Sequence, residues 1–409
     1  MNFRIVGVLL GAMLALAGCG GGGDSSASSG GGSASPSGTG TLQVSLTDAP
    51  ACGYDEVNVT VIGVRVHQSD SAGDGDGGWV DLPLPTPYAA SGLRINLLDL
   101  TNGALQGLGQ VALPAGTYTQ MRLLLAANGS NSAHFANSVV PTGGVETALA
   151  TPSAQQSGLK VKINAEVPAG QVAHVVIDFD ACRSVVKRGN SGKYNLKPVL
   201  SATLLLSDLA GMRVVGWVSP LLNNGSTQVS MQSGGVPVKA TAPDPATGRF
   251  ELFPVPVGTY ELVITAPGHA TAVMTGVPVL AASDTAVASP SQRIDTPLSA
   301  MDPVGGTVSP ASAEMRALQT LSGGPTVEVA WSAVDGDTGA FAFSLPQAAT
   351  VRTSFLSVTP LIVPANTVPF VPDLAVPGKY DIKATSGGLV RTQDVDVLLP
   401  VPPLVFAFP

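Results

Sequence analysis

The stretch Leu159-Lys-Val-Lys-Ile-Asn-Ala-Glu-Val167 decides the fold of this chain, because apolar and polar residues alternate along it without a break. A period of two places the apolar side chains on one face of a β-strand and the polar ones on the other. We therefore expect an antiparallel sheet with one buried face and one face in water. The same period occurs near the start of the chain, where Leu42, Val44 and Leu46 alternate with polar residues.

The alternation changes phase in the next expected strand. The valines at 57, 59 and 61 continue the period of two, whereas the valines at 64 and 66 lie on the other phase. One extra residue at Ile62-Gly63 accounts for the shift, since a β-bulge adds a single residue to one strand of a pair. We therefore predict one continuous strand that carries a bulge at this position.

The composition extends this reading to all 409 residues. The chain has 48 Gly and 33 Pro, 44% hydrophobic residues and only 12% charged ones. Such a mixture is typical of many short strands joined by tight turns. The predicted fold class is all-β, with antiparallel β-sandwich domains in tandem after a signal peptide and a disordered tether. The formal net charge of −8 argues against nucleic acid as a partner, because nucleic-acid binding requires clustered Lys and Arg.

The N-terminal stretch Leu16-Ala-Gly-Cys19 closes an apolar run that begins after Arg4. The run is shorter than the about 20 residues that a membrane-crossing helix needs. A basic start, a short apolar centre and small residues are typical of a secretory signal. The stretch resembles the lipobox of bacterial lipoproteins, which implies cleavage before Cys19 and acylation of its thiol. The resemblance implies a lipid-anchored protein of the cell envelope, with Gly20 favouring the outer membrane. A plain secretory signal is the alternative.

The chain after the signal divides by composition. Residues 20–40 are almost wholly Gly, Ser, Ala and Thr, and such a segment behaves as a flexible tether because it has too little apolar surface to fold. Turn signals then separate three folded domains, with a linker at residues 281–300. The expected parts are a signal peptide at 1–18, the tether at 19–40, and domains at 41–208, 209–298 and 302–409.

Four segments of the first domain resemble, in order, the bacterial family called domain of unknown function 4382. They are Leu42–Pro50, Tyr54–Thr60, Leu113–Leu123 and Pro152–Lys160. The resemblance implies secreted or lipid-anchored proteins with a β-sandwich-like domain. It implies no established activity.

The second domain resembles the carboxypeptidase regulatory-like domain, a small prealbumin-type β-sandwich, at Val215–Pro220, Asp244–Phe250 and Pro256–Tyr260. Despite the family's name, the resemblance implies an accessory fold and no peptidase activity. The same signals return at Val304–Pro310, Asp337–Phe341 and Pro377–Tyr380. We therefore interpret residues 302–409 as a degenerate second copy, with a Pro-rich inserted loop at residues 355–377.

Two cysteines remain when the anchor is set aside, Cys52 and Cys182. An even pair in an oxidising compartment favours a disulfide. Each cysteine follows an expected strand, so neighbouring strand ends would bring the two thiols together. Free or metal-bound thiols are the alternative.

Two acidic groups are candidate metal sites. Asp70, Asp74 and Asp76 lie in a Gly-rich loop, and clustered carboxylates on a bendable backbone suit Ca²⁺. Asp and Gly are also common turn residues, which favours a solvated loop instead. His174, Asp178 and Asp180 fall on one face of an expected strand at residues 172–180. That face is interpreted as the water-exposed side of a sheet, with a metal-binding patch as the alternative.

No catalytic motif is present in the sequence. A Gly-x-Ser-x-Gly elbow, a His-Glu-x-x-His helix and a Walker loop are all missing. We therefore predict no catalytic residues, no required cofactor and no enzyme. The predicted function is that of a lipid-anchored, non-catalytic structural or binding protein, which presents β-sandwich modules to a glycan or an envelope protein. The alternative is a Ca²⁺-dependent extracellular hydrolase that uses the loop at residues 70–76.

Overall fold

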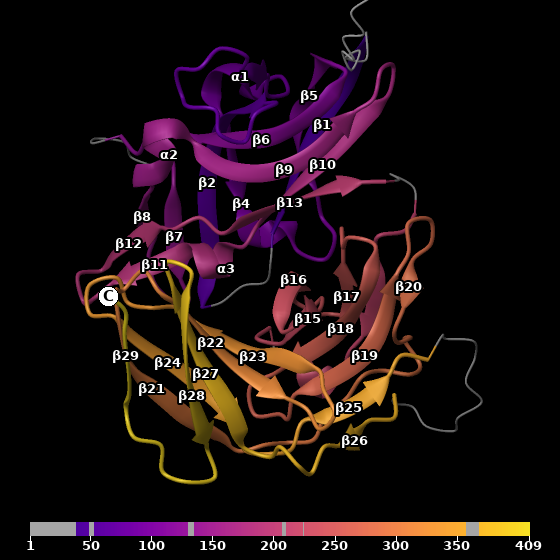
Figure 1. Cartoon of the computed structure of the whole chain (residues 1–409), viewed down its shortest axis with the longest axis vertical. Helices are drawn as coiled ribbons and strands as arrows, with labels where there is room; N and C mark the ends of the chain where they lie inside the picture. The colour runs from indigo at the N-terminus through magenta and orange to yellow at the C-terminus, as the bar shows by residue number, and fades with distance from the viewer. Residues whose placement is uncertain (1–37, 49–52, 130–134, 207–209, 224, 357–367) are drawn as a thin grey trace, which may run out of the picture. The chain divides into compact units, whose positions relative to one another are not determined.

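Strand β9, Leu159–Val167, has the alternating burial that its sequence predicts, with every odd-numbered residue buried and every even-numbered residue exposed. This computed structural model describes residues 38–48, 53–129, 135–206, 210–223, 225–356 and 368–409, which fall within one unit spanning Pro36–Pro409. The described residues form an all-β protein in which pairs of sheets enclose three main hydrophobic cores (Figure 1). The predicted all-β class of antiparallel-rich sandwiches is thus confirmed. The predicted signal peptide at 1–18 and most of the predicted tether at 19–40 lie outside the described residues, and residues 39 and 40 already belong to the first strand.

The first sandwich packs two sheets around its core. The order in one sheet is β13 (Leu200–Leu205), β10 (Val172–Phe179), β1 (Thr39–Asp48) and β5 (Gln106–Pro114). The order in the other is β11 (Val185–Arg188), β12 (Lys193–Leu196), β8 (Thr147–Ala150), β7 (Ser138–Pro141), β2 (Tyr54–His67), β6 (Gly116–Leu125) and β9, with β3 (Val80–Leu82) and β4 (Leu93–Asn96) also paired with β2. The short helices of this region are α1 (Tyr88–Ser91), η1 (Leu97–Leu100), α2 (Pro152–Ser157) and α3 (Ala181–Ser184).

Two local expectations can be checked in this sandwich. The pairing of β2 with β6 shifts register between Val61 and Gly63, so the predicted bulge is confirmed. The pairing of β1 with β10 is parallel, which the expected antiparallel sheet did not include. A parallel pair requires a long crossover. Here the chain between β1 and β10 enters the opposite sheet twice and places β5 beside β1 in between.

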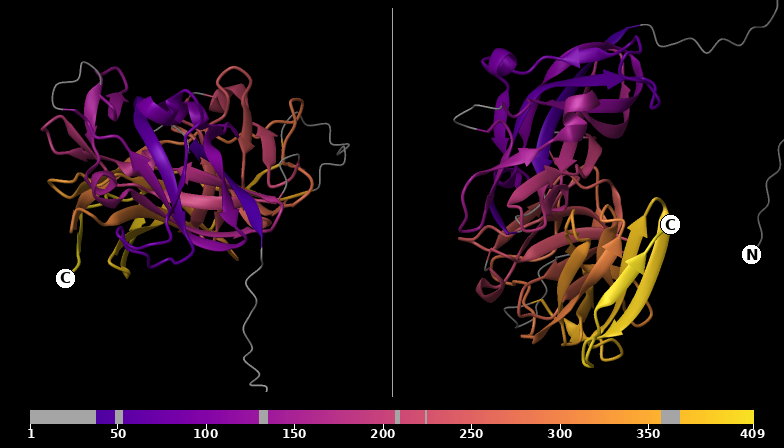
Figure 2. Two further views of the ribbon diagram at one scale, coloured as in Figure 1. Left: turned by 90° about the horizontal axis from the view of Figure 1, so that it is seen from above. Right: turned by 90° about the vertical axis from the view of Figure 1, so that its left-hand side faces the viewer.

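The second and third sandwiches have the same strand order. In the second, one sheet is β17 (Arg249–Leu252), β14 (Val214–Trp217) and β20 (Thr285–Ala286), and the other begins with β16 (Val236–Thr241), β15 (Gln228–Ser233), β18 (Gly258–Thr265) and β19 (Ala272–Val279). In the third, the sheets are β24 (Ala340–Pro346), β21 (Met301–Ser309) and β29 (Leu404–Ala407), and β23 (Thr326–Ser332), β22 (Glu314–Thr320), β27 (Lys379–Ser386) and β28 (Leu389–Asp396). The strands β28 and β29 are yellow in Figure 2. The helix η2 (Pro220–Leu222) follows β14.

The repetition extends to the turns. Asp244 Oδ1 accepts hydrogen bonds from the backbone N–H of Thr247 at 2.7 Å and from its hydroxyl at 2.7 Å. Asp335 Oδ1 accepts the same two bonds from Thr338, at 2.8 and 2.9 Å. Both aspartates therefore close a tight turn with backbone and hydroxyl donors, which accounts for the carboxylates of the Asp335 turn without a metal.

The boundary between the last two sandwiches differs from the expectation. The segment expected as a linker contributes β20 to the second sandwich, and Ile294 is fully buried in the same core. After β24 the chain returns to the second sandwich, where β25 (Val351–Ser354) pairs in parallel with β19 and β26 (Val371–Pro372) pairs with β25. Local patterning did not show this, because a strand of four residues takes its partner from tertiary packing.

None of the helices among the described residues combines the length and hydropathy that a membrane crossing requires. The short helices instead connect strands. In α3, for example, Asp180 is the N-cap residue, and its carboxylate accepts a hydrogen bond from the backbone N–H of Arg183 at 2.9 Å. This cap directs the chain from β10 into a turn that carries two charged side chains, Asp180 and Arg183.

Candidate functional site

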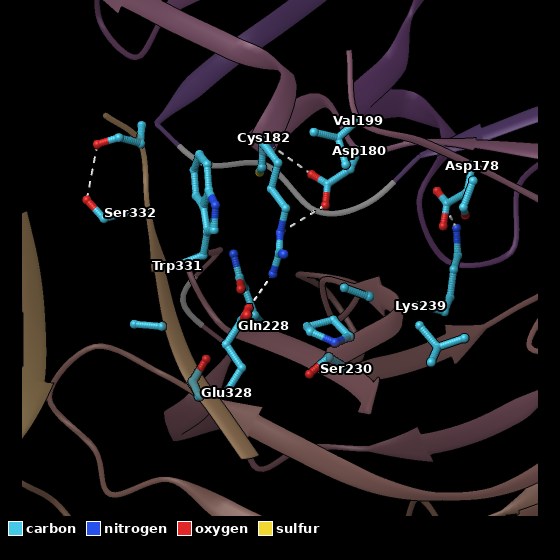
Figure 3. A pocket seen from close by; sticks show the side chains of 18 of the residues that line it. Asp178, Asp180, Cys182, Val199, Gln228, Ser230, Lys239, Glu328, Trp331 and Ser332 are labelled. Carbon is cyan, nitrogen blue, oxygen red and sulfur yellow. Dashed lines mark hydrogen bonds and ion pairs between the residues drawn. The ribbon is translucent and has the colours of Figure 1, made fainter. Parts of the chain in front are cut away.

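A cavity of about 840 Å³ lies where residues of all three sandwiches meet (Figure 3). Asp178, Asp180 and Arg183 come from the first sandwich, Lys239 from β16 of the second, and Trp331 from β23 of the third. The volume is within the usual range for pockets that hold small molecules. We call this space the junction cavity.

Strand β10 supplies the first carboxylate of the junction cavity. Asp178 Oδ1 lies 2.9 Å from Lys239 Nζ, and the side chain of this lysine is only 3% exposed. Lys239 Nζ also donates to the carbonyl oxygen of Asp48 at 3.3 Å. A buried ammonium requires such partners, because removing it from water without them costs several kcal/mol. Figure 3 shows Asp178 and Lys239 paired on the opposite side of the view from Trp331.

The guanidinium of Arg183 connects the first sandwich with the third. It lies 3.3 Å from Asp180 Oδ2 and 3.5 Å from Glu314 Oε1, and it forms an ion pair with Glu328. Glu328 also pairs with Arg316, and both of these residues are buried. The carboxylate of Glu328 is therefore held between two arginines from different sandwiches.

The backbone of Glu328 is held by the second sandwich as well. Its N–H donates to Gln232 Oε1 at 2.7 Å, and Gln232 Nε2 donates to the Glu328 carbonyl oxygen at 2.9 Å. This buried glutamine thus bonds to the main chain of β23 as a neighbouring strand would. The three sandwiches consequently meet at one residue, Glu328.

Burial changes the acidity of two carboxyl groups, those of Asp180 and Asp48. It raises the pKa of Asp180 to about 6, against the opposing effect of the Arg183 guanidinium. It also raises the pKa of Asp48 well above the usual value, although Asp48 Oδ1 accepts a hydrogen bond from Ala181 N at 2.8 Å. The nearby charges of Asp178 and Asp180 add to the rise at Asp48, and Lys239 opposes it.

The pKa of Asp180 predicts how stability depends on pH. Because the folded protein binds this proton more tightly than the unfolded chain, the stabilising contribution is complete below about pH 4 and is lost as pH rises through about 6. We expect the free energy of unfolding to decrease by on the order of 2 kcal/mol across this window from this group. Urea unfolding at pH 4.5 to 7, in wild type and Asp180→Asn, measures it.

The asparagine variant is expected to show a shallower pH dependence, because an asparagine side chain can still cap α3 but does not titrate. The raised pKa of Asp48 contributes in the same direction and remains in the variant. Asp244 and Asp335 have lowered pKa values because of their turn hydrogen bonds. Their effect on the free energy of unfolding therefore appears only at pH values below the usual pKa of an aspartate. If the free energy of unfolding depended equally on pH in wild type and in Asp180→Asn, the raised pKa would not belong to Asp180.

The predicted loop carboxylates lie away from the junction cavity. Asp74 Oδ1 is 2.7 Å from Arg122 Nη1 and 3.3 Å from Arg65 Nη1, and Asp76 Oδ2 accepts from Gly73 N at 2.8 Å. Within the described parts of the chain, no group of three or more His, Cys, Asp or Glu side chains is placed to hold a metal ion. Asp74 has guanidinium groups as its partners, so this loop offers no support for the Ca²⁺ alternative.

Other sequence expectations lie only partly within the described residues. Cys19 and Cys52 lie outside them, and Cys182 is a buried residue of α3 that also lines the junction cavity. His174 is 8% exposed, with its Nε2 2.9 Å from Ser45 Oγ, so this position of β10 does not face water. Of the patch expected on the wet side of a sheet, His174 is buried, whereas Asp178 and Asp180 are half-buried and line the junction cavity.

Sequence reasoning missed the junction cavity, although two signals for it are present. Lys239 and Glu328 each interrupt a strand of apolar and small residues at a position that proves to be buried. A charged residue at a buried strand position requires a counter-charge. The patterns of β16 and β23 therefore indicate two buried ion pairs, without showing which residues complete them.

Comparison with known proteins gives one family match, which covers part of the chain. No match was found among curated proteins. A streptococcal ancillary pilin is 9% identical with a TM-score of 0.15, over 90% of this chain and 98% of the pilin. The major pilin of Corynebacterium diphtheriae is 11% identical with a TM-score of 0.17, over 90% and 99%. These TM-scores are too low to support an inference about function. Residues 39–198 match the family described as domain of unknown function (DUF4382), which confirms the resemblance of the first domain.

Proposed function

We propose that this protein is a lipid-anchored, non-catalytic protein of the cell envelope that binds a glycan or protein ligand in the junction cavity. Acylated Cys19 would hold it in the membrane, most simply the outer membrane, and the residues between Cys19 and the start of β1 at Thr39 would form the tether. The modules after the first domain would be two copies of a carboxypeptidase regulatory-like sandwich. The matching strand orders and Asp turns of the second and third sandwiches support this duplication.

One observation carries the non-catalytic part of the proposal. Each carboxylate that lines the junction cavity is already engaged: Asp178 by Lys239, Asp180 and Glu328 by Arg183, and Asp335 by backbone N–H groups. A general base must accept a proton from a substrate, and an ion pair with a buried cation makes a carboxylate a weaker base. Groups neutralised in this way hold a cavity open and shape it, which suits binding rather than turnover.

The anchor is tested by intact mass and by detergent phase partition of the native protein. We expect cleavage before Cys19, fatty-acyl additions at this residue, and a mass lower by two hydrogens that reports the proposed Cys52–Cys182 disulfide. Cys19→Ser should move the protein from the detergent phase to the aqueous phase, since stable membrane anchoring needs two or more acyl chains. An unmodified N-terminus upstream of Cys19 would contradict the anchor.

The cavity is tested by a variant that fills it. Ala333 is exposed and lines the junction cavity, whereas Ala282 is exposed and lies elsewhere. We expect the full mature chain to co-sediment with purified envelope polysaccharide or peptidoglycan. Ala333→Trp should abolish this retention, and Ala282→Trp should preserve it. Equal retention of wild type and both variants would place the ligand at another surface.

A further inference from the structure

The charged groups of the junction cavity are matched within the chain. Four carboxylates and three cations line the cavity. Asp178 pairs with Lys239, and Arg183 pairs with Asp180 and Glu328. Lys187 is exposed at the rim, so its ammonium keeps its water. A charged ligand would have to compete with these internal pairs, and separating a buried pair costs about 3–5 kcal/mol.

Several neutral polar groups of the cavity remain available to a ligand. Within the described residues, the side chains of Ser201, Thr203, Gln228 and Trp331 line the cavity and have no hydrogen-bond partner. Gln228 and Ser201 are exposed, and Thr203 and Trp331 are half-buried. Together they offer hydroxyl and amide groups that both donate and accept, and one indole N–H that donates.

Trp331 adds a flat apolar surface to this set. The guanidinium carbon of Arg183 lies 5.8 Å from the centre of the Trp331 ring, so the indole is held beside the ion-paired wall. The face of an aromatic ring carries partial negative charge, which attracts the polarised C–H groups on one side of a sugar ring. A sugar presents hydroxyls around its edge and C–H groups on its face. The hydroxyls complement the unpaired polar side chains of the cavity, and the C–H face complements the indole ring.

We propose that the junction cavity binds an uncharged oligosaccharide, with Trp331 stacking on one sugar ring and Gln228 and Thr203 hydrogen-bonding its hydroxyls. This inference rests on the proposed function and names the class of its ligand. The volume of about 840 Å³ accommodates more than one sugar ring. The near balance of lining charges makes a neutral glycan a better fit than an acidic polysaccharide or a peptide terminus.

The test is a titration of the full mature chain in detergent, followed by calorimetry and tryptophan fluorescence. The neutral probes are maltotetraose, cellotetraose and N-acetylchitotetraose, and the contrasting probes are an oligogalacturonate and an alanine tetrapeptide. We expect binding of at least one neutral probe and of neither contrasting probe. Trp331→Ala should weaken that binding about tenfold or more, Trp331→Phe should weaken it less, and Gln228→Ala should also weaken it.

Trp217→Ala is the matched control. Trp217 is half-buried beside an arginine, with Arg249 6.0 Å from its ring centre, and it does not line the junction cavity. Its removal should leave binding unchanged. Binding of the oligogalacturonate or the peptide alone, abolished by Ala333→Trp, would overturn the saccharide assignment while supporting the proposed function. No binding of any neutral probe, or equal loss in both tryptophan variants, would also overturn it.

Discussion

Replacing Arg122 with methionine is expected to lower the free energy of unfolding by about 3 kcal/mol or more. Arg122 is fully buried, and its guanidinium donates to Asp74 at 2.7 Å, to the Ala72 carbonyl at 3.0 Å and to the Ser157 carbonyl at 3.1 Å. Methionine fills much of the same space but donates nothing. The loss leaves the Ser157 carbonyl without this donor, and it leaves Asp74 and the Ala72 carbonyl with only their longer contacts to Arg65 and Gln120 at 3.3 Å. An unsatisfied buried group costs about 1–3 kcal/mol.

The arginine also organises an aromatic stack. The Arg122 guanidinium carbon lies 4.4 Å from the centre of the Trp79 ring, and that of Arg65 lies 4.6 Å from it. Trp79 is the only tryptophan in residues 41–208. In a background that carries Trp217→Phe and Trp331→Phe, the fluorescence during urea unfolding reports on the first sandwich alone. There the Arg122→Met variant should show both an altered native signal and an earlier midpoint.

Arg94→Met provides the control for this prediction. Arg94 lies 2.7 Å from Glu146, but its side chain is 44% exposed. An exposed ion pair contributes about 0–1 kcal/mol, so the same substitution here should change the midpoint little. A comparable loss in both variants would show that the burial of Arg122 is not what makes it important.

Replacing Glu328 with alanine is expected to lower the free energy of unfolding by about 3–5 kcal/mol, through the contacts where the three sandwiches meet. The change removes the carboxylate between Arg183 and Arg316, which leaves two guanidinium groups facing each other with reduced compensation. Glu328→Gln keeps the shape of the side chain, so the free energy of unfolding should decrease less. Urea unfolding followed by circular dichroism measures both variants, and limited proteolysis detects separation of the sandwiches.

The matched control is Glu146→Ala, which removes the exposed partner of Arg94 within the first sandwich. We expect this variant to remain close to wild type and to resist proteolysis between sandwiches. Rapid cleavage between sandwiches in Glu328→Ala, with each sandwich still folded, would support the assigned role. A wild-type cleavage pattern and midpoint in Glu328→Ala would contradict it.

The features that sequence predicted well are those that depend on neighbouring residues. The burial of β9 follows from its period of two, and the bulge of β2 follows from a shift in that period at Gly63. The Asp244 and Asp335 turns are equally local, because the donors lie three residues from the aspartate. In each case the physical cause lies within a few residues of its effect.

The junction cavity could not be predicted in this way. Arg183 and Glu328 are separated by 145 residues, and nothing local to either identifies the other. The parallel pairing of β1 with β10 has the same origin, since its register depends on how the opposite sheet packs. A buried lysine such as Lys239 indicates that a counter-charge exists, but the fold alone decides that Asp178 supplies it.

The return of β25 to the sheet of the second sandwich has a consequence for how the chain is divided. A protein cut after Ala300 would lose β25 and expose the backbone N–H and C=O groups of β19 that β25 now pairs. An open strand edge of this kind is a template for pairing with other chains. The last two sandwiches therefore form one structural unit. They can be transferred to another protein together, whereas either one alone would be prone to aggregation.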